Sequence, residues 1–358
     1  MNLQNFPRHI GDPRRFDYKY PIKSYFVPLK HKGHDTLVQF DYSAQELRVT
    51  ALVAKDSEMI QAFLDGKDIH KETASIAFDT PIEEVSDDMR SNAKAVSFGL
   101  IYGETPESFA PKHNMTVEEA QEIFDKYFAS KPKIKDLIDN SHAFAKHYKY
   151  IEIPESGFRR RLADVDSNSF SNVQRALRQA LNTIVQGGSA YLMQCALNII
   201  NEHFHRHNID ASIIVTVHDS MVVSCPKDLV PLVVAICKTV MENLPLDFLT
   251  IEHNGEIIKF QMDADASVST NYNDECPYIE DEFVNAKSSD SYCAYYHDLG
   301  HLKNLKNEKM ISAEEHEALK ENHEKWKSYY MGVNKMTDNQ ALYDYHTWVH
   351  NYRGNKED

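Results

Sequence analysis

The sequence predicts an α+β protein that combines an antiparallel sheet with many helices. Short apolar segments at 36–40, 212–224 and 257–262 have the composition and alternation of strands. Longer stretches, most clearly 54–149 and 170–204, repeat apolar residues with the period of a helix. The segment at 212–224 has a polar tip between two apolar halves, so we expect the halves to pair as an antiparallel hairpin.

The bulk composition is that of a globular protein. With 358 residues and 42% hydrophobic side chains, the chain is long enough for two or three domains. Residues 1–10 lack the apolar stretch of a signal peptide, and no run approaches the ~20 apolar residues of a membrane span. The five cysteines are few, odd in number and unevenly spaced, as in reduced proteins. We therefore expect a cytoplasmic protein, or one of the host cytoplasm if it is viral, with no membrane partner.

The net charge of −15 argues at face value against binding a polyanion. The charges are distributed unevenly, however. Residues 8–32 carry seven Lys and Arg against two Asp, and residues 159–178 include five Arg. Much of the acidity lies in the last eighty or so residues. Basic faces are therefore expected in spite of the acidic total.

Residues 89–103 predict an amphipathic helix with cations and aromatic rings on one stripe. Arg90, Lys94, Phe98 and Tyr102 follow at intervals of four, so each lies only about 40° around the helix from the one before. The basic end of such a stripe suits phosphates, and the aromatic end suits stacking on a base. The same pattern also occurs on a solvated face that grades into a core, so both interpretations stay open.

Two aspartates stand at positions suited to a metal. Asp41 directly follows the strand at 36–40 and precedes a helix, where a lone Asp is more often a helix cap. Asp219 stands between His218 and Ser220 at the tip of the predicted hairpin, where a plain surface turn is the simplest interpretation. Carboxylates suit Mg²⁺ rather than a metal that prefers thiolates.

Other polar residues are candidates either for capping or for binding. Asp68, His70 and Thr73 stand near one helix start, where caps and a surface histidine explain them equally well. Arg159 opens a run of three arginines that are either solvated or in contact with phosphates. The residues that recur every four positions along 170–204 are Arg178, Asn182 and Gln186. That face is either the wet side of a core helix or a set of hydrogen-bonding groups for a ligand.

In chain order, three of these segments resemble the motifs of the DNA polymerase I family, also called family A. DYSAQELR at 41–48 is similar to motif A, and the pattern Arg-x3-Lys-x3-Phe-Gly-x2-Tyr-Gly at 90–103 is similar to motif B. His-Asp-Ser at 218–220 is similar to motif C, in which the family usually has Glu at the position of Ser220.

The resemblance implies the right-hand fold of a polymerase, with a palm built on an antiparallel sheet and helical fingers. The implied domains are the first part of the palm with motif A at 1–60, the fingers with motif B at 61–165, and the second part of the palm with motif C at 166–273. Residues 274–358 match no motif and are expected to form a C-terminal helical extension of unknown role. The proline-rich residues 2–28 are expected to be extended, and NLQNFP within them resembles the family's segment before motif A. Thumb and exonuclease domains are therefore expected to be absent from this chain.

The resemblance also implies a role for each motif residue. Asp41 and Asp219 would hold two Mg²⁺ ions, with the backbone carbonyl of Tyr42 as a further ligand. The residues implied to bind the incoming nucleotide are Arg90 and Lys94 at its phosphates, His70 near the triphosphate, Phe98 at its sugar and base, Tyr102 at the template position and Glu46 beside the sugar 2′ position. Lys94 would also assist catalysis by neutralising charge on the phosphates. The residues implied to contact DNA are Arg178, Asn182, Gln186, His218 and Arg159.

The function implied is that of a template-directed DNA polymerase, as a catalytic fragment or subunit that adds deoxynucleotides to a primer 3′-end by a two-metal mechanism. The expected partners are primer–template DNA, a deoxynucleoside triphosphate, and a separate polypeptide that carries a thumb and a proofreading exonuclease, as in a phage-type split polymerase. One alternative is a nucleotidyltransferase like the single-subunit RNA polymerases, which share a serine at the position of Ser220. Glu46 and the Phe98-Gly99 pair speak against it. The other alternative is a non-catalytic DNA-binding or scaffold subunit.

Overall fold

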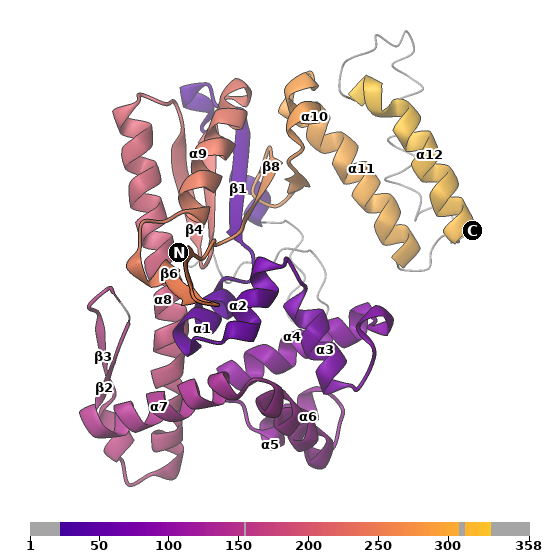
Figure 1. Ribbon diagram of the computed structural model, residues 1–358. Coiled ribbons are helices and arrows are strands. Elements are labelled where there is room, and N and C mark those ends of the chain that lie inside the picture. Colours follow the sequence, from indigo (N-terminus) through magenta and orange to yellow (C-terminus); the bar gives the residue numbers. More distant parts are fainter. Residues whose placement is uncertain (1–21, 154, 308–311, 331–358) are drawn as a thin grey trace. The chain divides into compact units, whose positions relative to one another are not determined.

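The computed structural model describes residues 22–153, 155–307 and 312–330 (Figure 1). It combines helices with antiparallel strands, which confirms the predicted α+β class. No helix in these ranges is both long enough and apolar enough to cross a membrane. Most of the segment expected to be extended, 2–28, lies outside the described residues.

The chain divides into two compact units, and each draws on segments that are far apart in sequence. Unit 1 comprises Met1–Tyr42, Ala196–Glu242 and Asp263–Asp358. Unit 2 comprises Ser43–Cys195 and Asn243–Met262.

The core of unit 1 is a five-stranded antiparallel sheet in the order β4-β5-β1-β8-β9. Its strands are β1 (Thr36–Tyr42), β4 (Ser212–Val217), β5 (Ser220–Cys225), β8 (Ala264–Ser269) and β9 (Cys276–Pro277). The strand predicted at 36–40 is the central strand, and the predicted hairpin is β4 with β5. Consecutive residues point to opposite faces of a strand, so the burial of Leu37, Val38 and Phe40 shows that both faces of β1 are covered. The helix α9 (Val230–Glu242) packs against β1 and β8.

The strand predicted at 257–262 is shorter in the structure and ends three residues earlier. The structure has β7 (Glu256–Lys259), which pairs with β6 (Thr250–His253) in a hairpin of unit 2. The strand that completes the sheet of unit 1 is β8, whose sequence ADASVS offers only Val268 as a large apolar residue. Its burial comes from the neighbouring strand β1 and from α9, which periodicity in the sequence alone does not reveal.

The described part of the C-terminal extension is mainly helical and belongs to unit 1. It contains α10 (Glu280–Asn285), α11 (Ser289–Asn307) and α12 (Ala313–Tyr330). The helix α11 packs against β8 and β9, and α11 and α12 lie side by side (Figure 1). The extension is therefore joined to the sheet edge through one of its helices.

Unit 2 is mainly helical. Its helices are α1 (Gln45–Ala54), α2 (Ser57–Leu64), α3 (Ile69–Ala77), α4 (Asp87–Ile101), α5 (Pro106–Phe109), α6 (Val117–Ser130), α7 (Pro132–Tyr148) and the part of α8 (Phe170–Arg206) up to Cys195. Asp56, Asp68, Ser86 and Thr116 each accept a backbone N–H bond as N-caps of α2, α3, α4 and α6. The short 3₁₀ helices of the described chain are Ile22–Tyr25, Lys30–Lys32, Ile82–Glu84, Ala110–Lys112, Ala163–Asp166, Lys227–Leu229 and Asp247–Leu249.

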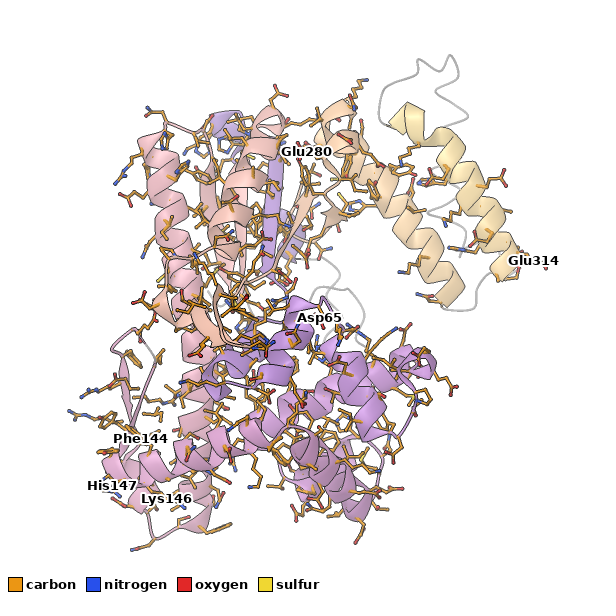
Figure 2. The ribbon with its side chains drawn as sticks, viewed as in Figure 1. Asp65, Phe144, Lys146, His147, Glu280 and Glu314 are labelled. Carbon is orange, nitrogen blue, oxygen red and sulfur yellow. The ribbon has the colours of Figure 1, made fainter. Side chains whose placement is uncertain are left out.

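A small hairpin follows α7 in unit 2. It pairs β2 (Tyr150–Glu152) with β3 (Arg159–Arg161). The strand β3 is the run of three arginines noted in the sequence. Ile151 is buried in a cluster with Leu162, Leu177 and Ile184, which anchors the hairpin to α8. The last two turns of α7 carry Phe144, Lys146 and His147 beside this hairpin (Figure 2).

Candidate active site

The two carboxylates predicted to bind metal lie at the same end of the sheet of unit 1. Asp41 is directly across from Ser220 in the pairing of β1 with β5, and the Tyr42 N–H donates to the Asp219 carbonyl at 3.2 Å. Asp41 is exposed and Asp219 is partly exposed. The Tyr42 ring is buried, and its hydroxyl donates to the Met241 carbonyl of α9 at 3.0 Å. The residue that follows Asp41 is therefore fixed by packing.

His218 and Asp219 form the two-residue turn of the hairpin between β4 and β5. His218 has a φ of +53°, which tight antiparallel turns require, and its side chain is exposed. The Ser220 hydroxyl donates to the Val217 carbonyl at 2.8 Å. The serine that replaces the usual glutamate thus stabilises the turn that presents Asp219.

The structure adds a third carboxylate that the sequence did not single out. Asp265 is directly across from Asp41 in the pairing of β1 with β8, and directly opposed side chains share a face of a sheet. Within the described residues, no group of three or more His, Cys, Asp or Glu is arranged to hold a metal ion. Mg²⁺ usually keeps several waters and takes only one or two protein carboxylates, so Asp41 and Asp219 fit it.

The helix α4 of unit 2 presents the predicted stripe of cations and rings. It begins at Asp87 and ends at Ile101, two residues before the predicted end. The Lys94 Nζ lies 5.9 Å from the Phe98 ring centroid, and the Phe98 and Tyr102 rings stack at 6.1 Å with an interplanar angle of 20°. The opposite face of α4 is buried through Ala93, Val96, Leu100 and Ile101. Burial of that face leaves the stripe available to a ligand.

Asp68 joins two elements that the sequence did not connect. Its Oδ1 accepts the N–H groups of His70 at 3.0 Å and Lys71 at 3.1 Å, which caps α3, while its Oδ2 accepts the Arg90 Nε–H at 2.7 Å. Partial burial alone would raise the pKa of the Asp68 carboxyl, but the bonds from Arg90 and from the backbone outweigh burial and lower that pKa. The start of α3 is therefore tied to the basic end of α4.

His70 of α3 lies next to Phe98, at the aromatic end of the same stripe. Its ring centroid is 6.2 Å from that of Phe98, it is only 9% exposed, and its Nδ1 has no hydrogen-bond partner within the described residues. Burial lowers the pKa of His70, and the positive charges of Lys94 and Arg90 lower it further. The structure thus brings His70 together with the three predicted nucleotide-binding residues of α4.

Glu46 and Tyr102 are also brought together. The Tyr102 hydroxyl donates to the Glu46 carboxylate, which links the first turn of α1 to the C-cap of α4. The carboxylate is therefore held in a defined orientation at the aromatic end of the stripe.

The predicted DNA-binding residues of unit 2 lie on α8 and β3. Arg178 and Gln186 are exposed, and Asn182 is half-buried. Gly103 has a φ of +71°, and a Cβ at that position would lie 2.6 Å from the Arg178 Cγ, so the end of α4 packs closely against Arg178. The Arg159 guanidinium pairs with Glu152 at 2.5 Å and lies 4.9 Å from the Tyr150 ring centroid.

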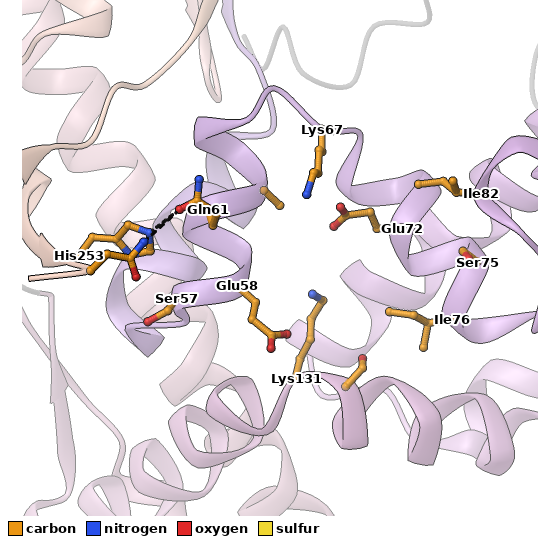
Figure 3. Close-up of a pocket in the computed structure, with 13 residues that line it drawn as sticks. Ser57, Glu58, Gln61, Lys67, Glu72, Ser75, Ile76, Ile82, Lys131 and His253 are labelled. Atoms are coloured by element: carbon orange, nitrogen blue, oxygen red, sulfur yellow. Dashed lines mark hydrogen bonds between the residues drawn. The ribbon is translucent and has the colours of Figure 1, made fainter.

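Unit 2 also contains an open cavity of about 560 Å³ that includes none of these residues. The side chains of Lys67, Glu72, Glu58 and Lys131 point into it (Figure 3). The cavity is therefore separate from the stripe of cations and rings on α4.

Comparison with known proteins shows the fold and the family of the chain. The solved POL domain of Pol1 from M. smegmatis, in complex with DNA primer-template and dNTP, superimposes with a TM-score of 0.65 at 26% sequence identity, over 76% of this chain and 44% of that one. Residues 1–274 match the family described as DNA polymerase family A. The chain therefore belongs to DNA polymerase family A.

Two curated relatives illustrate the similarity. The DNA polymerase of Bacillus phage SP01 is 35% identical over 284 residues, which cover 76% of this chain and 30% of the phage protein. DNA polymerase I of Geobacillus stearothermophilus is 35% identical over 242 residues, which cover 67% of this chain and 26% of the relative. The matched part thus spans less than a third of the length of either relative.

Proposed function

We propose that this chain carries the nucleotidyl-transfer centre of a DNA-directed DNA polymerase, which adds deoxynucleotides to a primer 3′-end. The main support is the position of Asp41 at the end of β1 next to Asp219, which lies in the turn that Ser220 stabilises. The similarity to a POL domain solved with DNA primer-template and dNTP also supports the proposal. In this proposal the sheet of unit 1 belongs to the palm and residues 61–165 belong to the fingers.

The carboxylates of Asp41 and Asp219, with the Tyr42 carbonyl, would hold two Mg²⁺ ions. When bound, such ions promote attack by the primer 3′-hydroxyl on the α-phosphate and stabilise the departing pyrophosphate. Arg90 and Lys94 would offset charge on the triphosphate. Because Arg90 is already oriented by Asp68, little side-chain ordering would be required when the nucleotide binds.

The remaining predicted residues would position the base pair and the DNA. Phe98 would lie against the sugar and base, and Tyr102 would occupy the template position. Arg178 and Gln186 would donate to purine N3 and pyrimidine O2 atoms, acceptors that every base pair presents in the minor groove. Asn182, His218 and Arg159 would complete the contacts with the duplex. Because every correct base pair presents these acceptors, such donors can bind any correct pair without reading its sequence, as replication requires.

We also propose that a separate polypeptide with a thumb, and with a proofreading exonuclease, joins this chain in the working enzyme. The acidic total charge supports this part of the proposal, because a grip on duplex DNA needs many cations. The domain limits at 60, 165 and 273 and the cytoplasmic location are proposals of the same kind.

Primer extension with the purified 358-residue chain tests the proposal. Asp41→Asn and Asp219→Asn should each lower the extension rate by at least about 10³-fold, because each removes a charge that organises the metal ions. Asp228→Asn is the matched control, since Asp228 is an exposed carboxylate beyond the other end of β5. Near-normal extension by either active-site variant would refute the assignment.

Ser220 favours one second candidate, a nucleotidyltransferase that uses ribonucleotides. The same assay with ribonucleoside triphosphates decides between the two. A higher kcat/KM with ribonucleotides than with deoxynucleotides would favour the second candidate. No extension with either substrate, together with normal DNA binding, would instead favour a scaffold subunit.

A further inference from the structure

We propose that the end of α7 and the hairpin β2–β3 bind single-stranded DNA, such as the unpaired part of a template. The rings of Phe144, Tyr148 and Tyr150 and the cations Lys146 and Arg161 form what we call the aromatic–basic surface. All five residues belong to unit 2. The inference rests on the proposed function, because only a polymerase would bring a template to this surface. None of the five residues is among those proposed above to bind the nucleotide or the metal ions.

The three rings gather at the surface of unit 2 instead of in its core. The Phe144 ring centroid lies 4.5 Å from that of Tyr148 and 5.5 Å from that of Tyr150, and the Tyr148 and Tyr150 centroids are 6.1 Å apart. Phe144 is 36% exposed and Tyr148 is 52% exposed. Large side chains of this kind normally bury their area, so a cluster of exposed rings indicates a surface that another molecule covers.

The hairpin places cations beside the rings. Tyr150 is directly across from Arg161, and Glu152 is directly across from Arg159. Because side chains alternate along a strand, these four residues share one face, while Ile151 between them is buried on the other face. The Arg159 guanidinium accordingly lies 4.9 Å from the Tyr150 ring centroid.

Charge pairing leaves this surface positive. Arg159 is paired with Glu152 and Lys149 is paired with Asp166. Lys146 and Arg161 have no ion-pair partner within the described part of the chain. A local positive charge on a chain with a net charge of −15 is complementary to a polyanion.

The combination of rings and cations selects a single strand. In duplex DNA the base faces are stacked on one another, so only phosphates would be available and the exposed rings would remain uncovered. Bases of a single strand can stack on aromatic side chains while Lys and Arg neutralise the phosphates, and such binding tolerates any sequence. The aromatic–basic surface presents both components within one cluster.

The test measures binding of the full chain to a fluorescent oligo(dT) of about twelve nucleotides, which offers no primer end. Phe144→Ala and Tyr148→Ala together should raise the dissociation constant by at least about tenfold, the loss expected for one or more stacked bases. Tyr25→Ala is the matched control, since it removes an exposed ring of unit 1. It should leave the dissociation constant unchanged.

The charges are tested separately on the same oligonucleotide. Lys146→Glu and Arg161→Glu should each weaken binding. Each should also lower the slope of log affinity against log salt concentration by the amount expected for about one phosphate contact. Lys133→Glu is the control, because it makes the same charge change near the other end of α7. It should change the affinity much less.

Primer extension on a template with a two-nucleotide overhang separates this inference from the proposed function. The double aromatic variant, Lys146→Glu and Arg161→Glu should extend that primer at the wild-type rate while losing affinity for oligo(dT). Unchanged oligo(dT) binding in the double aromatic variant would overturn the inference, as would an equal loss with Tyr25→Ala. Self-association of the wild type that disappears in the double variant, with oligo(dT) binding intact, would overturn it in favour of a contact between copies of the chain.

Discussion

The Glu46 carboxylate accepts a hydrogen bond from the Tyr102 hydroxyl and is thereby oriented at the aromatic end of the α4 stripe. If the stripe binds the incoming nucleotide, this carboxylate is a steric and electrostatic barrier to a ribose 2′-hydroxyl. Glu46→Ala should then lower the ratio of kcat/KM for deoxynucleotides to that for ribonucleotides by about 10- to 100-fold. Steady-state extension with each nucleotide class measures the ratio.

Tyr102→Phe provides the control for this prediction. It keeps the ring and removes only the hydroxyl, so it should lower the ratio less than Glu46→Ala does. An unchanged ratio in Glu46→Ala would show that sugar selection lies elsewhere in the chain.

His70 makes the stability of the protein depend on pH. Its pKa is lowered from 6.5 by burial first and then by Lys94 and Arg90, so the unfolded chain binds a proton there at a pH where the folded protein does not. The free energy of unfolding must therefore fall as the pH drops below 6.5. His70→Gln should lose less stability than the wild type between about pH 7.5 and pH 5, as measured by denaturant titration at both values.

His142 offers an independent comparison, because burial lowers its pKa too. His142→Gln should also reduce the loss of stability at low pH, and the double variant should reduce it more than either single variant. Identical pH dependence in the wild type and His70→Gln would contradict the assignment of this effect to His70.

At the scale of single residues, the sequence predicted which side chains share a helix face better than it predicted the contacts between elements. The spacing of Arg90, Lys94, Phe98 and Tyr102 was enough to place them on one face, because helix geometry fixes that relation. The bond from Asp68 to Arg90 joins residues 22 positions apart, and no local period encodes it. The same holds for Glu46 and Tyr102, which are 56 positions apart.

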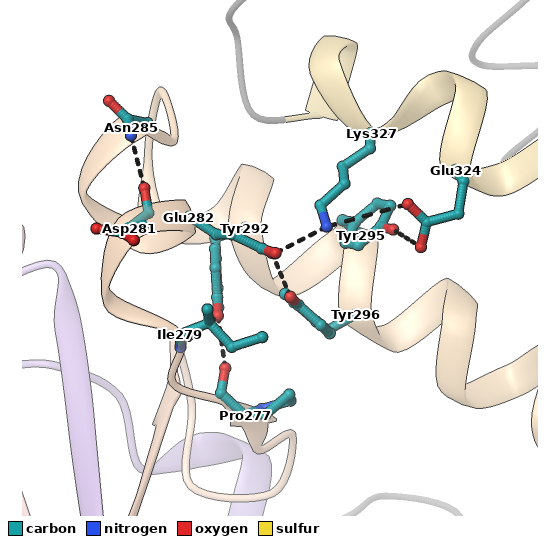
Figure 4. Close-up of polar contacts among 10 residues, drawn as sticks. All are labelled: Pro277, Ile279, Asp281, Glu282, Asn285, Tyr292, Tyr295, Tyr296, Glu324 and Lys327. Carbon is teal, nitrogen blue, oxygen red and sulfur yellow. Dashed lines mark hydrogen bonds and ion pairs between the residues drawn. The ribbon is translucent and has the colours of Figure 1, made fainter.

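Among the elements, the C-terminal extension depends on one buried tyrosine. The Tyr292 hydroxyl donates to the Pro277 carbonyl at 2.6 Å and accepts the Ile279 N–H at 3.0 Å, so it joins α11 to the segment between β9 and α10 (Figure 4). Tyr292→Phe would leave both backbone groups without this partner. The free energy of unfolding should fall by about 1–3 kcal/mol in denaturant titration, the cost of unpaired buried polar groups.

Tyr296→Phe is the matched comparison on the same helix. Its hydroxyl donates to the Glu282 carboxylate, but its side chain is only partly buried. Water can replace that bond, so the loss of stability should be smaller than in Tyr292→Phe. An equal or larger loss in Tyr296→Phe would contradict the role given to Tyr292.

Elements with strong local signals were predicted correctly, and those that depend on their neighbours were not. The hairpin β4–β5 is rich in Val and Ile, and β1 combines Val with Leu, Phe and Tyr; side chains of these kinds favour buried strands. The strand β8 is composed mostly of Ala, Ser and Asp, and pairing with β1 makes it a strand. Because the sequence did not predict β8 as a strand, it did not indicate that Asp265 lies opposite Asp41 either.

For the whole molecule, the acidic total charge sets how strongly DNA can be held. Cations that release counterions from phosphates supply most of the sequence-independent affinity. The described cations near the proposed DNA contacts are partly neutralised by carboxylates, as in the pairs of Arg159 with Glu152 and Arg175 with Asp164. A chain with a net charge of −15 therefore gains little long-range attraction for a duplex.

The isolated 358-residue chain should consequently extend primers distributively. With an excess of unlabelled primer–template added as a trap at the start of the reaction, each binding event should add only a few nucleotides, and raising the salt concentration should shorten the products further. A polypeptide that carries a thumb should lengthen the products under the same trap, because a second set of cations would hold the duplex between additions. Products hundreds of nucleotides long from the isolated chain in one binding event would contradict this expectation, and they would show that the chain encloses the duplex by itself.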